Sequence, residues 1–139
     1  MNVDSIQNGY VIDHIQAGMA MKIYSALNLD ELSCSVAVLK NVSSGKMGKK
    51  DIIKIDELID LNLDVLGYIA PDITVNVIKD GRLIEKCSPE LPLEIVDIIK
   101  CKNPRCITSV EQELPQIFVL TDRQERTYRC KYCESRAKN

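Results

Sequence analysis

Aromatic residues are scarce in this sequence of 139 residues, with no tryptophan, one phenylalanine and five tyrosines. A hydrophobic core must therefore be built mainly from isoleucine, leucine and valine. Basic residues are not in excess either: the chain has 18 lysines and arginines and 20 acidic residues, for a formal net charge of −2. A generic nucleic-acid-binding protein is usually basic, so this balance argues against that class.

Export and membrane segments are also missing from the sequence. The first eight residues carry neither a basic region nor an apolar run, and no stretch approaches the length of a membrane span. We therefore expect a cytoplasmic protein without membrane contact. Histidine occurs once, at His14, so the sequence does not predict a catalytic zinc site of the usual histidine-containing kind.

Four of the six cysteines form two close pairs near the C-terminus. Cys101 and Cys106 form the first pair, and Cys130 and Cys133 form the second. Two such pairs supply the four thiolates that tetrahedral Zn²⁺ requires, and Pro104 favours a tight turn within the first pair. We predict one structural zinc ion, because four cysteines close the coordination shell and leave no open position for water.

Other interpretations of the cysteines are open. Two disulfides would need an oxidising compartment, to which nothing in the sequence points. A thioredoxin-like redox site would normally place its C-x-x-C between a strand and a helix. The remaining cysteines, Cys34 and Cys87, lie in apolar strand-like runs and are expected to be buried thiols.

The order of elements predicts an α+β protein with a ferredoxin-like (βαββαβ) domain followed by a small antiparallel sheet. Apolar spacing indicates helices over 18–28 and 57–66, the second with Asp56 as its N-cap. The stretch 41–50 is expected to be a polar loop, without the residue order of a phosphate-binding loop. The predicted strands are 9–16, 33–40, 51–55, 74–78, 82–86, 95–100, 116–121 and 126–130.

A proline-containing stretch at 88–92 divides the chain into two expected domains, 1–91 and 92–139. In the second domain, one predicted strand leads into the first cysteine pair and a hairpin leads into the second. The zinc would therefore pin a small sheet. Since this segment is too short for a large core of its own, metal binding would supply much of its folding free energy.

Several polar residues of the first domain could bind a ligand. Asp13 and His14 lie in the middle of a strand, so one of the two should point toward packed structure. Lys50 and Lys54 share one face of their strand, opposite to the face of Asp51. Two ammonium groups at this spacing suit a polyanion such as a nucleotide phosphate. Lysines also protect sheet edges, however, and the polar pair could equally meet water near a strand end.

Several segments, taken in order, resemble the regulatory chain of aspartate carbamoyltransferase over nearly the whole sequence. They are 11–15 (VIDHI), 44–55 (SGKMGKKDIIKI), Ala70-Pro71, 74–76 (TVN) and the cysteine quartet. The resemblance implies a non-catalytic regulatory subunit in pyrimidine biosynthesis. Its first domain would be an allosteric module for nucleoside triphosphates, with CTP and UTP as inhibitors and ATP as activator. Its zinc domain would contact the catalytic chain, and regulatory homodimers would bridge catalytic trimers.

The resemblance also implies a nucleotide site in the first domain. Asp13 would meet the ribose or nearby polar groups, while Lys54 and Lys86 would meet the phosphates and the sugar. Further polar residues would lie around the phosphates or a second nucleotide position: His14, Lys50 and Asn76. The residues that read or enclose the base would be Asp4, Ser5 and Ile6, through their backbone, and the apolar Val11 and Leu83.

The sequence departs from the family pattern at two positions. Gly81 and Ser88 stand where other members carry an aromatic residue and an arginine, so nucleotide binding would be weaker or differently selective. The direction of control stays open.

A stand-alone zinc-ribbon protein that binds nucleic acid is the alternative, and a steep salt dependence of DNA or RNA binding would favour it. Its basis is a group of basic residues near the cysteines: Arg105, Arg123, Arg126, Arg129 and Lys131.

Overall fold

The computed structural model describes residues 5–137, and the chain divides into two compact units, 1–90 and 91–139. The strands are β1 Gly9–Gln16, β2 Val36–Ser44, β3 Gly48–Ile55, β4 Thr74–Lys79, β5 Arg82–Cys87, β6 Glu94–Val96, β7 Ile117–Asp122 and β8 Thr127–Cys130. The helices are α1 Ala20–Ala26, α2 Leu63–Ile69 and α3 Ile107–Val110, with a 3₁₀ turn at Leu29–Glu31. No helix within residues 5–137 is long and apolar enough to cross a membrane.

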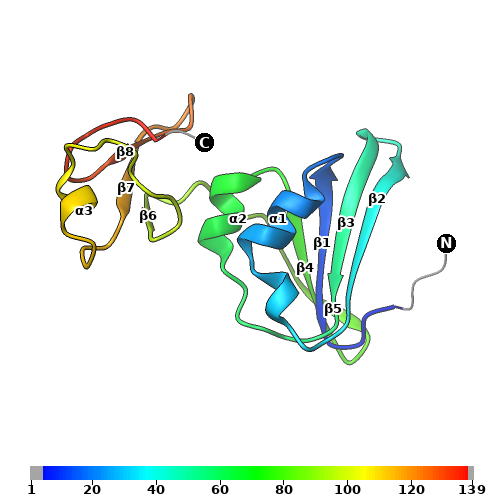
Figure 1. Ribbon diagram of the computed structural model, residues 1–139. Coiled ribbons are helices and arrows are strands. Elements are labelled where there is room, and N and C mark those ends of the chain that lie inside the picture. The colour runs from blue at the N-terminus through cyan, green and yellow to red at the C-terminus, as the bar shows by residue number, and fades with distance from the viewer. Residues whose placement is uncertain (1–4, 138–139) are drawn as a thin grey trace. The chain divides into compact units, whose positions relative to one another are not determined.

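Each unit contains its own antiparallel sheet (Figure 1). In the first unit the strand order is β2-β3-β1-β4-β5, and in the second it is β6-β7-β8. The first four strands therefore have the ferredoxin-like arrangement, to which β5 adds a fifth strand beside β4. This architecture confirms the predicted α+β class.

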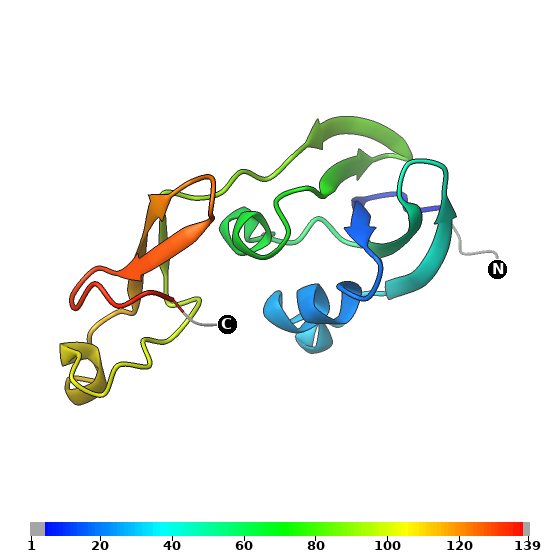
Figure 2. The ribbon, with the colours of Figure 1, turned by 90° about the horizontal axis from the view of Figure 1, so that it is seen from above.

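Both helices of the first unit lie on the same side of its sheet, as Figures 1 and 2 show for α1 and α2. The strand residues that face these helices form the core. The other side of the sheet, here called the helix-free face, carries no helix formed by residues 5–90. On β3 the predicted alternation holds: Asp51, Ile53 and Ile55 are buried, whereas Lys50 and Lys54 are half-buried. The core is aliphatic, as the shortage of aromatic residues predicts, and its buried members are Ile12, Ile15, Ala20, Ile23, Leu29, Ile53, Ile55, Leu66, Ile73 and Val75.

The second helix begins later than predicted. α2 starts at Leu63, and the Asn62 side chain caps it by accepting hydrogen bonds from the backbone N–H of Asp64 (3.1 Å) and Val65 (3.2 Å). The prediction of a helix from residue 57 with Asp56 as N-cap was therefore wrong. One reason is that the Tyr10 hydroxyl donates to the backbone carbonyl of Ile59 at 2.7 Å, which holds that carbonyl outside a helix.

The predicted polar loop at 41–50 was also wrong. β2 and β3 continue through this stretch as a hairpin, in which Val42 pairs with Lys50 and Ser44 pairs with Gly48. The end of the hairpin extends past the helix-covered core, so polar side chains on both faces can meet water. Polarity alone therefore did not distinguish a loop from an exposed hairpin.

The second unit is small, and its largest buried side chains are Tyr128 and Phe118. β6 is shorter than the predicted strand 95–100, and the short helix α3 was not predicted. The other two cysteines of the chain, Cys34 and Cys87, are half-buried at the margin of the first core, not buried as expected. Partial burial raises the pKa of both thiols.

We predict that Asn62→Ala will lower the stability of the first unit by about 1 kcal/mol, because it removes the N-cap of α2. Asp56→Ala is the matched control, since the Asp56 side chain is exposed and caps no helix. The measurement is the midpoint of urea unfolding followed by circular dichroism. A larger loss in the Asp56 variant would contradict the observed helix start.

Candidate functional site

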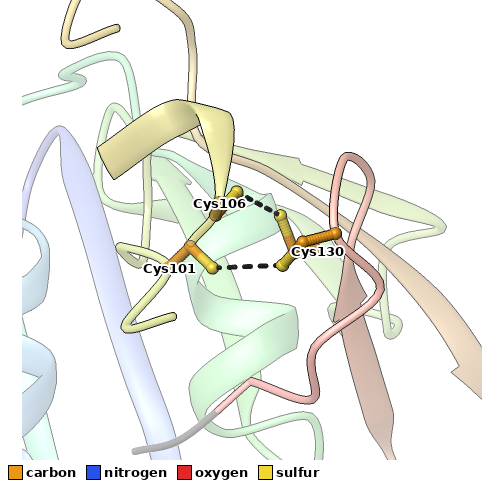
Figure 3. Close-up of side chains that lie close together, drawn as sticks. Cys101, Cys106 and Cys130 are labelled. Atoms are coloured by element: carbon orange, nitrogen blue, oxygen red, sulfur yellow. Dashed lines mark hydrogen bonds between the residues drawn. The ribbon is translucent and has the colours of Figure 1, made fainter. Parts of the chain in front are cut away.

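The four clustered cysteines come together in the second unit, as their spacing predicted. All their sulfur atoms lie within 4.8 Å of one another. The Sγ atoms of Cys101 and Cys133 are 3.6 Å apart, and those of Cys106 and Cys130 are 3.7 Å apart. Figure 3 shows the side chains of Cys101, Cys106 and Cys130 directed toward one another.

These separations fit a tetrahedral zinc site. With Zn–S bonds of about 2.3 Å, the edges of the sulfur tetrahedron measure about 3.8 Å. A disulfide needs sulfurs only about 2.05 Å apart, and all six cysteines are free thiols. The donor set and its spacing are thus those of one structural zinc ion, and four thiolates leave no position for substrate.

The backbone around the first cysteine pair is held by Asn103. Its Oδ1 accepts from the Arg105 N–H at 3.0 Å, and its backbone carbonyl accepts from the Cys106 N–H at 3.0 Å. Its Nδ2 donates to the Ser135 Oγ at 3.1 Å, which joins the two cysteine-bearing segments. The Gln116 Oε1 accepts from the Cys101 N–H at 2.9 Å. These contacts orient the two cysteine-bearing segments around the sulfur cluster.

The thiols differ in how readily they ionise. Burial raises the pKa of Cys101 to about 12. The Thr108 hydroxyl, 3.1 Å from the Cys106 Sγ, lowers the pKa of Cys106. Burial also acts to raise the pKa of Cys133, but hydrogen bonds from Ser135 and Asn103 outweigh it and bring the pKa to about 6. Holding all four sulfurs as thiolates therefore requires a bound cation.

A second group of predicted residues forms a row across the sheet of the first unit. Ala37 pairs with Lys54, Lys54 with Val11, Val11 with Asn76, and Asn76 with Lys86, so the row crosses all five strands. Directly opposed residues share a face. This is the helix-free face, because the residues next to the row on β1, β3 and β4 belong to the core.

Asp13 and His14 lie in a β-bulge of β1, where the pairing with β3 shifts between Ile12 and Ile15. His14 has a φ of 59°, which explains how two polar residues fit between two core residues. Ile12 and Ile15 are both fully buried, whereas Asp13 and His14 are half-buried. The simple alternation that we assumed for this strand was therefore wrong. The His14 Nδ1 lies 3.2 Å from the Thr74 Oγ1.

The charges of the helix-free face include one ion pair and the ammonium groups of Lys54 and Lys86. The Lys50 Nζ lies 2.9 Å from the Asp13 Oδ1, and the same oxygen accepts from the His14 N–H at 2.6 Å. Burial acts to raise the pKa of Asp13, but these two contacts outweigh it and the pKa is lowered. Lys54 forms no salt bridge within residues 5–137. This face therefore offers a positive charge to an anionic ligand.

The other residues expected near the base are less well defined by contacts. Leu83 pairs with Ile78, two residues after Asn76, so it belongs to the helix-free face, and it is 56% exposed. Ser5 is exposed and Ile6 half-buried, whereas Asp4 lies outside the described residues.

The β4–β5 turn holds the segment that follows Ser5 and Ile6. The Gly81 N–H donates to the Gln7 carbonyl at 2.9 Å, and the Asp80 N–H donates to the Asn8 Oδ1 at 3.1 Å. Gly81 has a φ of 75°, and a Cβ there would lie 3.0 Å from the Gln7 Oε1. A glycine suits this turn for both reasons.

Sequence reasoning overlooked two residues that organise these sites. Asp51 is fully buried and accepts three backbone hydrogen bonds, although the sequence had placed this carboxylate on the apolar face of β3. A carboxylate there needs partners, and that was the available signal. Asn103, before Pro104, has the composition of a turn, but its link to Ser135 could not be read from the sequence.

Comparison with known families gives two matches that together cover nearly the whole chain. The model for the aspartate carbamoyltransferase regulatory chain, allosteric domain, matches residues 1–90. The model for the aspartate carbamoyltransferase regulatory chain, metal binding domain, matches residues 93–139. The sulfur cluster lies within the second match and the lysine row within the first.

Individual proteins named aspartate carbamoyltransferase regulatory chain are similar along their full length. The protein of Clostridium tetani is 50% identical over 135 residues, which cover 96% of this chain and 94% of the relative. That of Clostridium botulinum (strain Hall) is 50% identical, with 96% and 92% covered. That of Bifidobacterium longum is 44% identical, with 99% of both chains covered.

We predict that Cys101→Ser will lose most of the bound zinc, because the cation would keep only three thiolates. Cys34→Ser is the matched control, since Cys34 belongs to the first unit and lies outside the sulfur cluster. The measurement is zinc per chain by mass spectrometry of the purified protein. Equal zinc content in both variants would contradict the assignment of the ligands.

Proposed function

The chain belongs to the family of aspartate carbamoyltransferase regulatory chains, and from this premise we propose that it is a non-catalytic subunit through which nucleotides control carbamoyl transfer. The observation that carries the proposal is the lysine row on the helix-free face, within the unit that matches the allosteric domain.

The first unit supplies the nucleotide site in this proposal. Lys54 and Lys86 bind phosphate and sugar oxygens, and Asp13 binds the ribose or nearby polar groups. This face suits a nucleotide, because the row offers two ammonium groups, an amide and the apolar Val11 within adjacent strands. Further ligand contacts are proposed for residues around this row: Asp4, Ser5, Ile6, His14, Lys50, Asn76 and Leu83.

The second unit supplies the contact with the catalytic chain. Its zinc, held by Cys101, Cys106, Cys130 and Cys133, fixes a sheet of only three strands. Large apolar side chains are exposed on this unit, among them Leu93 at 70% and Val110 at 73%. Exposed apolar side chains of this size are suited to a protein partner. We propose further that this contact builds a cytoplasmic assembly in which paired regulatory chains bridge catalytic trimers.

The alternative of a stand-alone zinc-ribbon protein that binds nucleic acid is not favoured. The family matches extend over both units, and the zinc unit is the smaller of the two. The arginines near the cysteines are better explained as the polar rim of a protein interface. A steep fall of RNA or DNA binding with salt would revive the alternative.

Control by such a chain requires that nucleotide binding be coupled to the quaternary equilibrium of the assembly. A nucleotide shifts the catalytic assembly only by its different affinity for two quaternary states, typically by about 1–3 kcal/mol. The nucleotide unit must therefore be coupled to the zinc unit that holds the catalytic chain. Binding to the isolated regulatory chain and response of the whole assembly are distinct measurements of these two steps.

We predict that Lys54→Ala will weaken nucleotide binding by about 1.5–3 kcal/mol, which is on the order of a tenfold to hundredfold change in Kd. The reason is the loss of a charge-assisted hydrogen bond to phosphate. Lys22→Ala is the matched control, because Lys22 is an exposed lysine of α1, on the other side of the sheet. Calorimetric titration with CTP and ATP gives the affinities, and unchanged binding in the Lys54 variant would refute the site.

We further predict that removal of zinc by a chelator will unfold residues 91–139 while the first unit stays folded, because the first core contains no metal ligand. The catalytic chain should then dissociate. Amide NMR signals report each unit, sedimentation reports the assembly, and added zinc should restore both. An assembly that survives complete demetallation would contradict the proposed contact.

A further inference from the structure

A buried carboxylate lies directly behind the proposed nucleotide face. The Asp51 side chain is 0% exposed. Its Oδ2 accepts from the backbone N–H of Gly18 (3.0 Å) and Ala20 (3.2 Å), and its Oδ1 accepts from the N–H of Asn41 (3.0 Å). The nucleotide contacts proposed above make no use of this group, although burying a carboxylate requires such a set of partners.

The carboxylate lies between two β-bulges. In β1, the extra residue lies between Ile12 and Ile15, and Ile15 pairs with Asp51. In β2, the shift lies between Leu39 and Val42, directly opposite Asp51. Each bulge contains a residue with a φ of 59°, which is His14 in β1 and Asn41 in β2.

The bond to the Asn41 N–H fixes the β2 bulge directly. This N–H lies in the irregular part of the ladder, and the Asp51 carboxylate supplies its acceptor. The bonds to Gly18 and Ala20 fix the start of α1, which follows β1 by three residues. One side chain on β3 thus holds the neighbouring parts of the chain on both sides of its strand.

The residue before Asp51 is Lys50, whose side chain points to the opposite face of β3. Lys50 reaches the Asp13 Oδ1 at 2.9 Å, and Asp13 belongs to the β1 bulge. The position of this ion pair therefore depends on the backbone of β3 at residues 50–51 and on the bulge beside it. The carboxylate on the other face belongs to this same stretch of β3, and it bonds the backbone that follows the β1 bulge, at Gly18 and Ala20.

We propose that Asp51 is a positioning residue for the nucleotide face: by anchoring Asn41, Gly18 and Ala20 it holds the two bulges in register and so sets the geometry of the Asp13–Lys50 pair. This proposal rests on the proposed function for its effect on nucleotides. Its structural part, the control of the ion pair, can be tested without any ligand.

The test uses Asp51→Asn in the zinc-loaded full chain. The amide keeps the shape of the side chain but replaces one acceptor oxygen with a donor NH₂, which cannot satisfy the backbone N–H facing it. Leu29→Ala is the control. Leu29 is 1% exposed, so its truncation destabilises the same core, and it leaves the residues of the helix-free face unchanged. Both variants should therefore have a lower unfolding temperature.

Two readouts separate positioning from stability. The ¹³C signal of the Asp13 carboxyl carbon gives the pKa of Asp13, which should rise toward its ordinary value in Asp51→Asn and stay low in Leu29→Ala. Calorimetry with CTP and ATP should show affinity weaker by on the order of tenfold to hundredfold in Asp51→Asn, because a small displacement of ligand-binding groups is costly. Leu29→Ala should retain wild-type affinity at a temperature where it is folded.

An unshifted Asp13 pKa in folded Asp51→Asn would overturn the proposal, and so would an equal shift in both variants. If the wild-type chain binds neither nucleotide, the proposed function fails, while the Asp13 titration still decides the role of Asp51.

A second pair of variants covers the case in which Asp51→Asn does not fold. Both variants keep the backbone N–H of residue 41. Asn41→Val disfavours the positive φ of the bulge, whereas Asn41→Gly tolerates it. The proposal then expects a raised Asp13 pKa in Asn41→Val alone. Identical Asp13 titrations in these two variants would overturn it.

Discussion

In the described part of the first unit, helices cover one face of the five-stranded sheet, and the placement of its charges depends on this constraint. Apolar side chains on alternate strand positions bury against α1 and α2. The intervening positions must then face away from the core, and in the middle of the sheet they are Lys54, Val11, Asn76 and Lys86. If both faces of the sheet were covered, these ammonium groups would be buried and would each need a neutralising partner. The helix-free face and the core thus result from the same alternation of side chains.

The second unit has a three-stranded sheet and few buried apolar side chains, so its core alone contributes little stability. Phe118, Tyr128 and Ile95 are its large buried side chains, and three cysteines of the sulfur cluster are buried as well: Cys101, Cys106 and Cys130. The sulfurs of the two close pairs approach each other to 3.6 Å (Cys101 and Cys133) and 3.7 Å (Cys106 and Cys130), so the four need a cation to remain thiolates together. Metal binding and folding of this unit are therefore expected to be one process. Such a unit can present exposed apolar residues to a partner without a large core of its own.

Much of this arrangement could be predicted from the sequence, where spacing constrains the answer. The cysteine pairs, the fold class and the faces of β3 were correctly inferred, because each depends on a period or an interval along the chain. The start of α2 was not, since the Tyr10 bond to the Ile59 carbonyl joins residues far apart in sequence. The bulge at Asp13 and His14 also broke the assumed alternation. Asp51 shows the same limit: its need for partners was visible, but the identity of the three N–H donors depends on the fold.

The proposed transmission of nucleotide binding to a catalytic partner can be measured in the native assembly. A tagged copy would be purified gently from its own cells, and carbamoyl transfer from carbamoyl phosphate to aspartate would be measured in the eluate. The account predicts transferase activity that changes when CTP or ATP is added. An eluate with no such activity and no larger partner would contradict it.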